Sequence, residues 1–350
     1  MAATIHDMIR LKRTNKNTFE SLALPERMGT EARLAFGGCA LSMTVSAAFQ
    51  TVETLSRGRM ALYSALGHFL GPALIDRAVF LKVTALRDTR TFATRQVIAF
   101  QKQDDGRERA CLSAQLDFIV SPTDDQSIHS FLQYSVSSPQ TVSPEVLRSY
   151  SEALRDRVMD GALHPNVEKA YTANFRLFET LFEYKMPPDA PLSENVMGID
   201  KTRKTSQDHL PLTSKRHLDY FRIRQNTSST FSPLDPDALP ISSACLHFAA
   251  LAFALDAAIA FIPLSLSHNF LPDVAACSSL DFALRFHIDV MDAGRWHLRE
   301  IRTLVGDYGR TYNESRLWNE KGRLVATMSQ QDILRPHGGP DKRTRGEAKL

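Results

Sequence analysis

The hydrophobic and polar positions of the chain fall into two similar series, separated by a long polar stretch. The first series opens with Phe36-Gly37-Gly38 and an apolar run over 39–49, which predicts a helix entered through glycines. Strand-like segments follow over 78–86, 91–102 and 110–120, and Asp104-Asp105-Gly106 predicts a hairpin turn between the last two. The first series therefore predicts one helix followed by a meander of antiparallel strands.

The second series repeats this order roughly two hundred residues later in the chain. An apolar segment over 243–262 predicts a helix. Turn-forming residues at 292–294 and 319–322 separate the strand-like segments that follow, which lie at 280–290, 296–305, 312–318 and 324–334. Because the order of elements is repeated, we expect an internal duplication and an α+β fold.

The middle of the chain is polar and irregular. Residues 139–175 are expected to be partly helical, with Pro144 at a helix start. The part over 186–240 is rich in Pro, Ser, Thr, Asp and Lys and has one strand-like segment at 218–225, so we expect a surface linker with little chemistry. The predicted organisation is a first unit over 1–138, a connecting segment over 139–240, a second unit over 241–335 and a flexible tail over 336–350.

Composition narrows the class of protein. Of the 350 residues, 43% are hydrophobic and 23% are charged, which is typical of a soluble globular protein. The net charge is only +3, which indicates no nucleic-acid partner. The four cysteines show no C-x-x-C spacing and are expected to be free thiols. The apolar segment 244–266 is long enough for a membrane span, but His247, Asp256 and Pro263 favour a buried helix and no membrane span.

Few sequence signals point to chemistry. The chain contains no Gly-rich phosphate loop, no H-E-x-x-H, no G-x-S-x-G and no zinc-ligand spacing. Asp256 stands out inside an apolar helix, where a carboxylate either reaches the surface or is paired or protonated. Ser279 precedes a predicted strand, and Gln330 shares one face of the last strand with Asp332. From the residues alone, Ser279 is also compatible with a plain turn and Gln330 with an exposed strand position.

A series of motifs, in order along nearly the whole chain, resembles the acyl-CoA thioesterase II family. The most specific is the run LRDTRTFATRQV over 86–97, which is similar to the family's Leu-Arg-Asp-Gly and Ser-Phe-x-x-Arg-x-Val runs. The resemblance implies an α+β double hot-dog fold, with two helix-plus-antiparallel-sheet halves in one chain. The other motifs are Phe36-Gly37-Gly38, Phe69-Leu70-Gly71-Pro72, 251–263, Ser279-Leu280-Asp281 with Phe286-His287, and 325–335.

The resemblance also implies a reaction. In this family an Asp on the second hot-dog helix, a Ser or Thr before a strand and a Gln on the last strand bind the attacking water. The corresponding residues are Asp256, Ser279 and Gln330. Asp256 would act as general base in the hydrolysis of an acyl-CoA thioester, with no metal or cofactor. The rival hypotheses are a non-catalytic acyl-CoA-binding hot-dog protein and a hot-dog hydratase or dehydratase, although the helix has no Asp-His pair.

The sequence departs from the family at several positions. Leu66 stands where many relatives have His, Gly71 where many have Arg, and Phe282 where His is frequent. The predicted first helix carries no acidic residue, which implies a non-catalytic first half. These differences concern the acyl group that is accepted, and they leave the three-residue set intact. Hot-dog sheets often pair side by side, so the resemblance leaves room for a homo-oligomer.

The C-terminus carries a candidate targeting signal. The chain ends in Ala348, Lys349 and Leu350, a conservative variant of the Ser-Lys-Leu signal that the peroxisomal import receptor binds. The preceding residues are rich in Gly, Lys and Arg and poor in apolar side chains, so a receptor could reach them. These features predict a peroxisomal enzyme of lipid or fatty acid metabolism, or of a specialised-metabolite pathway. The alternative is an ordinary disordered end.

Overall fold

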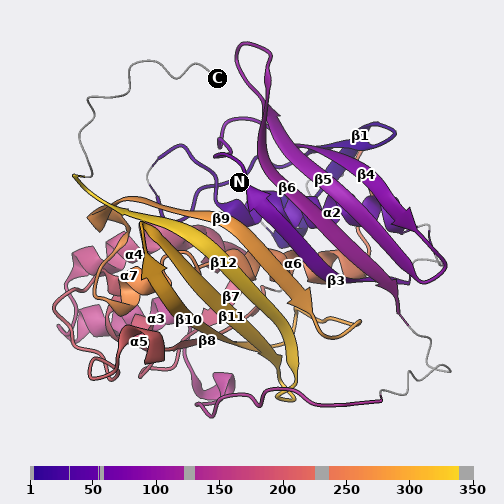
Figure 1. Ribbon diagram of the computed structural model, residues 1–350. Coiled ribbons are helices and arrows are strands. Elements are labelled where there is room, and N and C mark those ends of the chain that lie inside the picture. Colours follow the sequence, from indigo (N-terminus) through magenta and orange to yellow (C-terminus); the bar gives the residue numbers. More distant parts are fainter. Residues whose placement is uncertain are drawn as a thin grey trace.

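The two halves of the chain share one antiparallel sheet, and the predicted α+β class is confirmed. The computed structural model describes residues 4–30, 32–53, 55, 59–121, 131–224 and 236–338. In these residues 12 strands follow the order β1-β2-β4-β5-β6-β3-β9-β12-β11-β10-β8-β7 (Figure 1). The strands are Leu11–Asn15 (β1), Thr18–Ser21 (β2), Met60–Phe69 (β3), Phe80–Asp88 (β4), Phe92–Lys102 (β5), Glu108–Val120 (β6), Phe182–Lys185 (β7), His217–Ile223 (β8), Val274–Phe286 (β9), His297–Asp307 (β10), Arg310–Asn319 (β11) and Leu324–Pro336 (β12).

The strand order shows the duplication that the repeated pattern predicts. Counted outward from the seam, the first half runs β3, β6, β5, β4 and the second runs β9, β12, β11, β10. The same connectivity therefore occurs twice, and each half is extended at its outer edge by two short strands. At the seam Ser64 on β3 pairs with Arg285 on β9, and His68 pairs with Asp281. The sequence pattern did not predict β3, because its buried positions do not alternate.

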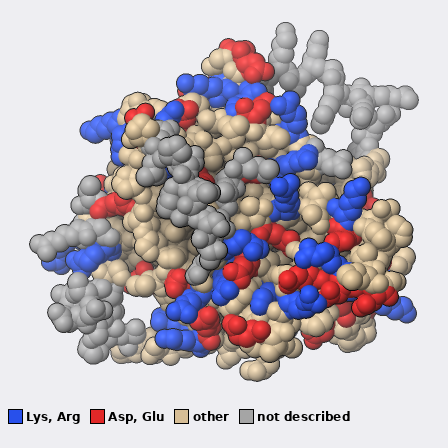
Figure 2. All heavy atoms as spheres, turned by 180° about the vertical axis from the view of Figure 1, so that it is seen from behind, with Lys and Arg blue, Asp and Glu red and all other residues tan. Residues whose placement is uncertain are grey.

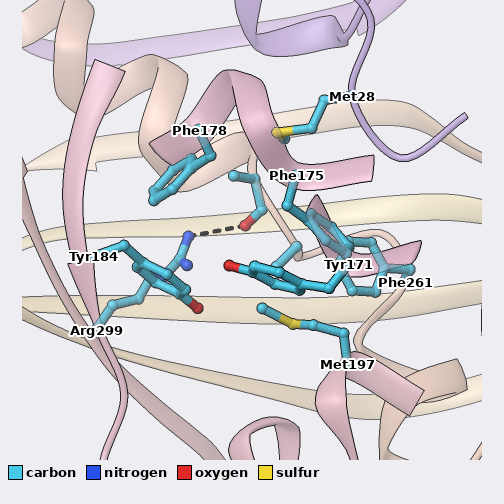
Figure 3. Close-up of a pocket in the computed structure, with 10 residues that line it drawn as sticks. Met28, Tyr171, Phe175, Phe178, Tyr184, Met197, Phe261 and Arg299 are labelled. Carbon is cyan, nitrogen blue, oxygen red and sulfur yellow. Dashed lines mark hydrogen bonds between the residues drawn. The ribbon is translucent and has the colours of Figure 1, made fainter. Parts of the chain in front are cut away.

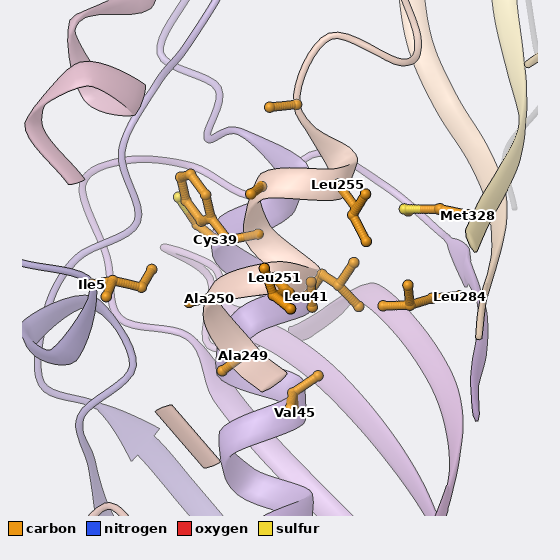
Figure 4. Close-up of a cluster of buried hydrophobic side chains, with 14 of the residues drawn as sticks. Ile5, Cys39, Leu41, Val45, Ala249, Ala250, Leu251, Leu255, Leu284 and Met328 are labelled. Carbon is orange, nitrogen blue, oxygen red and sulfur yellow. The ribbon is translucent and has the colours of Figure 1, made fainter. Parts of the chain in front are cut away.

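Two buried helices lie antiparallel to each other. α2 (Gly37–Val52) belongs to the first half and α6 (Ser243–Asp256) to the second. Phe36 before α2 packs edge-on against Phe253 near the end of α6, and Phe49 stacks on Phe248 at the opposite ends. Helices that are apolar on nearly every side are stable only when covered on every side. Figure 4 shows part of this core, which includes Leu41, Val45, Leu251, Leu255, Leu284 and Met328.

The helix of the second half ends earlier than the pattern predicts. We expected a helix over 243–262, whereas α6 ends at Asp256 and a separate helix, α7, spans Ile262–Leu266. Ala257 is extended, and Ala258 has a φ of 72°, in the left-handed region that non-glycine residues rarely adopt. Asp256 is therefore the last residue of a helix rather than an interior one. In the part of the chain that the structure describes, no helix is long and apolar enough to cross a membrane.

The connecting segment is helical and packs against the second half. It contains α3 (Tyr150–Met159), α4 (Pro165–Leu181) and α5 (Pro191–Glu194), with 3-10 turns at Pro144–Val146, Val196–Gly198 and Leu212–Ser214. In Figure 1 its helices gather with α7 at the end of the second half. The predicted strand at 218–225 corresponds to β8, which pairs with β10. Residues 225–235 lie outside the described residues.

The expectation that 186–240 is a surface linker is wrong for its first part. Leu192, Asn195 and Val196 are fully buried. Asn195 is a polar residue, but its Nδ2 donates to the Ser265 carbonyl at 2.7 Å, so it is satisfied inside the protein. Ser265 Oγ in turn donates to the Met197 carbonyl at 2.6 Å. A polar composition therefore does not keep this stretch on the surface, because its polar groups bond to one another and to α7.

Charged side chains of both signs are mixed on the surface. In Figure 2, Lys and Arg lie next to Asp and Glu over the described part of the face that is drawn. Arg302 on β10 pairs with Glu314 on β11, and Arg222 on β8 pairs with Glu183 on β7. This mixture agrees with the small net charge of the chain.

Candidate active site

The three candidate residues from the sequence lie together at the end of α6. Gln330 Nε2 on β12 donates a hydrogen bond to Asp256 Oδ1 at 2.5 Å. Ser279 Oγ on β9 donates to Gln330 Oε1 at 3.3 Å. Asp256 is only 4% exposed and Gln330 is 0% exposed, so neither is the surface residue that the sequence also allowed. The side chains form one continuous hydrogen-bonded chain from Ser279 through Gln330 to Asp256.

A β-bulge in β9 turns Ser279 toward this site. Gln331 pairs with Asp281 and Asp332 pairs with Ser279, so Leu280 is an extra residue in β9. Beyond the bulge, side chains of β9 are buried at every second position from Phe282. The extra residue reverses the alternation, and Ser279 therefore shares the buried face with Phe282. Simple alternation along β9 would have pointed Ser279 away from Gln330.

The first half of the chain also reaches the site, through the start of α2. The Gly38 backbone N–H lies near the Asp256 carboxylate and favours its ionised form. A Cβ on Gly37 would lie 3.0 Å from Asp256 Oδ2 and 2.8 Å from the Phe69 ring. Only glycine therefore lets the start of α2 come this close to Asp256 without moving the Phe69 ring. The N-terminus of α2 thus faces the C-terminus of α6 across the carboxylate, and the positive end of the α2 dipole lies against it.

Burial makes Asp256 a weak acid. Removal from water raises the pKa of its carboxyl to about 7, while the hydrogen bond from Gln330 and the nearby Gly38 N–H act in the opposite direction. A group with a pKa near neutrality can accept a proton from water and later return it. The arrangement therefore provides a general base at the end of a chain of fixed hydrogen-bonding side chains.

A buried ion pair fixes the end of α6, and sequence reasoning did not find it. Arg299 on β10 binds both carboxylate oxygens of Asp219 on β8, at 2.9 and 2.6 Å, and both residues are almost fully buried. Arg299 Nη1 also donates to the carbonyls of Ala254 and Ala257, at 2.7 and 2.8 Å. The Ala254 carbonyl also accepts the Ala257 N–H at 3.2 Å, so Arg299 adds a second bond to it and binds the carbonyl of the residue that follows the helix. Arg299 therefore ties together the backbone on both sides of Asp256 at the end of α6.

An apolar pocket lies beside the same helix end (Figure 3). Its volume is about 300 Å³, including the part open to solvent. Ala257 and Ala258, which directly follow Asp256, form one wall, and Arg299 lies at another. The remaining walls are mainly aromatic, and they come from α4, β7 and the loop after Ala258: Tyr171, Phe175, Phe178, Tyr184 and Phe261. The backbone directly after Asp256 thus forms part of the pocket wall.

Other chemically active side chains lie elsewhere or are unreactive. His247, near the start of α6, accepts a hydrogen bond from the Ala293 N–H at 3.1 Å and is not paired with Asp256. All four cysteines are free thiols, as predicted, and burial raises the pKa of Cys39, Cys245 and Cys277 to about 12. In the described residues, no group of three His, Cys, Asp or Glu side chains could hold a metal ion.

Two family matches cover both halves of the chain. Residues 24–119 match the acyl-CoA thioesterase N-terminal domain, and residues 202–334 match the acyl-CoA thioesterase C-terminal domain. The second match begins within the connecting segment and includes Asp219 and all three candidate residues.

Solved structures share the fold over nearly the whole chain. The acyl-CoA thioesterase II TesB2 of Mycobacterium marinum superposes with a TM-score of 0.63 at 19% identity, over 96% of this chain and 100% of its own. The tesB protein of Mycobacterium avium subspecies paratuberculosis has a TM-score of 0.62 at 18% identity, over 95% and 98%. A conserved protein of unknown function with hot-dog fold from Alicyclobacillus acidocaldarius has a TM-score of 0.61 at 14% identity, over 95% and 97%.

These identities show the fold alone, and they confirm the predicted hot-dog architecture. The activity rests on the two matched domains, which together account for both halves of the duplicated sheet. The chain therefore belongs to the acyl-CoA thioesterase family that these two domains define and is an acyl-CoA thioester hydrolase.

Proposed function

We propose that the enzyme hydrolyses a fatty or related acyl-CoA to the free acid and CoA by direct attack of a water held by Asp256, Ser279 and Gln330. The observation that carries this proposal is the hydrogen-bonded chain from Ser279 through Gln330 to a buried carboxylate. A thioester carbonyl is electrophilic enough for attack by a positioned water, so no covalent enzyme intermediate is required. Two fixed side chains and one base are sufficient to hold that water.

The proton moves in two steps. Asp256 takes one proton from the water as its oxygen forms a bond to the carbonyl carbon. The carbon–sulfur bond then breaks, its electron pair stays on sulfur, and the proton on Asp256 becomes available to the departing CoA thiolate. The start of α2, with Gly37 and Gly38, faces this site with the positive end of its helix dipole. This end would stabilise the negative charge that develops on the carbonyl oxygen.

Replacement of Asp256 by Asn tests the proposal. The variant keeps the size of the side chain but cannot accept the proton of the water. We expect kcat for acyl-CoA hydrolysis, followed by release of the CoA thiol, to fall by roughly a hundredfold or more. Circular dichroism and a thermal melt should show that the variant remains folded. Turnover close to that of the wild type would remove Asp256 from the mechanism.

The same assay separates the rival functions. A non-catalytic acyl-CoA-binding protein would release no CoA thiol from any member of an acyl-CoA panel, although it would still bind them. A hydratase or dehydratase would change the acyl chain and leave the thioester intact. Such enzymes commonly use an acid–histidine pair. Here His247, near the start of α6, accepts a hydrogen bond from the Ala293 backbone N–H and does not pair with Asp256.

We further propose that the pocket beside Asp256 accepts the acyl group. The support is its position, because Ala257 and Ala258, which follow Asp256 in the chain, form part of the pocket wall. Its lining is aromatic and apolar, which suits a hydrocarbon chain. A small pocket of this kind would favour short or compact acyl groups over long ones.

Substitution in α4 tests this assignment. Phe175→Leu removes part of the pocket wall while keeping the residue apolar. The enlarged pocket should therefore raise kcat/KM for acyl-CoA substrates with longer acyl groups. We expect the ratio of kcat/KM for a long acyl-CoA to that for a short one to rise by roughly tenfold. Phe80→Leu on β4, in the other half of the molecule, serves as control. If kcat/KM depends on acyl length in the same way in Phe175→Leu and in wild type, the acyl group does not bind in this pocket.

A further inference from the structure

A second buried carboxylate lies next to the three proposed site residues. Asp332 is two residues beyond Gln330 on β12, faces the same side of the sheet and is 0% exposed. Its Cα pairs with that of Ser279 on β9, because the bulge at Leu280 shifts the register between the two strands. Ser279 therefore lies beside both Gln330 and Asp332.

The hydrogen bonds around Asp332 are incomplete. Asn313 on β11, which is also fully buried, donates from Nδ2 to Asp332 Oδ2 at 2.7 Å. Among the described residues, Asp332 Oδ1 and Asn313 Oδ1 have no hydrogen-bond partner. An unpaired buried acceptor destabilises the fold, so two adjacent ones require an explanation. A proton on Asp332 would convert one of these two acceptors into a donor.

The elements packed around Asp332 present negative or neutral groups to it. α6 contributes Asp256, β9 contributes Asp281, Ser279 and the Cys277 thiol, and β11 contributes Asn313. Burial raises the pKa of Asp332 to about 7, and the charges of Asp256 and Asp281 add to this rise, whereas the hydrogen bond from Asn313 and the nearby Ser279 hydroxyl oppose it. Two coupled carboxylates of this kind do not ionise independently. When one of them carries a charge, the neutral form of the other is favoured.

We propose that Asp332, in its neutral form, is a positioning residue that sets the direction of the hydrogen bonds from Ser279 through Gln330 to Asp256. This inference rests on the function proposed above. The Ser279 hydroxyl has one proton, which it donates to Gln330 Oε1. Gln330 then presents Nε2 to Asp256, and the lone pairs of Ser279 Oγ stay available to the attacking water. An ionised Asp332 competes for the Ser279 proton and disrupts this direction.

The pH dependence of kcat/KM tests this role. Ionisation of Asp256 activates the wild-type enzyme and ionisation of Asp332 inactivates it, so its profile between about pH 5 and pH 9 should be bell-shaped. Asp332→Asn keeps a neutral side chain at every pH, so the decline on the alkaline side should disappear. We expect the ratio of kcat/KM at about pH 9 to that at about pH 7 to rise by roughly tenfold over wild type. Asp307→Asn, at the exposed end of β10, is the control and should keep the wild-type profile.

A second variant leaves Asp332 itself in place. Asn313→Ala removes the donor that favours the ionised form of Asp332, so the alkaline decline should move to higher pH. A merely structural role would change kcat or stability without moving the profile. Profiles of Asp332→Asn and Asn313→Ala that superimpose on that of the wild type would overturn the inference. The function proposed above is judged separately, by the turnover of Asp256→Asn.

Discussion

Asp256 accepts a hydrogen bond from Gln330 and lies near the Gly38 N–H, yet it is a costly residue for the fold. Its carboxylate is buried at the negative end of α6, where a charge is unfavourable. Gln330 and the Gly38 N–H compensate for this only in part, since the pKa of the carboxyl is still raised to about 7. Active sites commonly keep such groups at the expense of stability.

Because the pKa of Asp256 is raised in the folded protein, the free energy of unfolding should depend on pH. The folded protein binds the Asp256 proton more tightly than the unfolded chain does, because the folded pKa of about 7 exceeds the unfolded value. The contribution of Asp256 to stability is therefore present at low pH and is lost as the pH rises through 7. In Asp256→Asn this loss is absent, so the variant should gain about 1–3 kcal/mol over wild type at about pH 8 and little at about pH 4. Urea unfolding at the two pH values measures the difference. An equal gain at both would show that folding does not raise the pKa of Asp256.

Ser279 and Gln330 should act as a unit. If both hold the same water, the loss of one already releases it, so the two losses are coupled. Ser279→Ala and Gln330→Ala should each slow hydrolysis, and the double variant should lose much less than the product of the two effects. Gln331→Ala is the control and should be mild, because strand alternation turns its side chain to the other face of β12. Fully multiplicative effects would show that the two residues do not share one water.

At the scale of elements, the geometry of the site depends on where α6 ends. Arg299 bonds to two carbonyls at this end and to Asp219 on β8, which brings β8 and β10 into the support of Asp256. The Tyr184 hydroxyl on β7 also donates to Asp219, at 3.0 Å. The outer strands of the second half therefore do more than widen the sheet, because they anchor the helix that carries the base.

Arg299 should consequently be essential for stability. Arg299→Lys retains the charge but loses the two-pronged contact with Asp219 and at least one carbonyl bond. Since the pair is buried, we expect the free energy of unfolding to fall by about 3–5 kcal/mol. Arg302→Lys on the same strand disrupts a half-exposed pair with Glu314 and should cost at most about 1 kcal/mol. Chemical denaturation compares the two, and equal losses would contradict the special role of Arg299.

At the scale of the whole molecule, the duplicated pattern of the sequence was sufficient to predict two helices and most of the strands. It could not predict the end of α6, since that end is set by the φ of Ala258 and by Arg299 from a distant strand. The resemblance supplied Asp256, Ser279 and Gln330 as candidates. Local periodicity did not predict three features of the site, because they depend on strand register and on tertiary contacts. These features are the bulge at Leu280, the ion pair of Asp219 with Arg299, and the approach of Gly37 and Gly38 to Asp256.

Peroxisomal import stays a prediction, because Ala348, Lys349 and Leu350 lie outside the described residues. The receptor for this type of signal reads the end of the chain. A fluorescent protein fused before residue 1 should give a punctate peroxisomal pattern, and deletion of Leu350 should leave it cytosolic. Lys342→Ala upstream in the tail is the control and should not change the pattern. Unchanged peroxisomal fluorescence after the deletion would show that the tail is not the signal.

The seam between the halves connects the fold to the site. Gly67 on β3 pairs with Phe282 on β9, and Phe282 in turn pairs with Gln330 on β12. A Cβ on Gly67 would lie 2.6 Å from the Ser113 carbonyl oxygen and 2.7 Å from the Phe282 ring, so the strands or the ring must move.

Gly67→Ala should therefore lower the free energy of unfolding by about 1–3 kcal/mol, and it should also slow hydrolysis by shifting Phe282 against Gln330. Gly71→Ala is the matched control, since its Cβ would meet only the Ala110 carbonyl oxygen, at an ordinary 3.5 Å. Denaturation and CoA release are measured on both variants. They test whether a change in packing at the seam also displaces Gln330 and slows hydrolysis. If Gly67→Ala loses stability but keeps wild-type kcat/KM, the seam joins the two halves without influencing the position of Gln330.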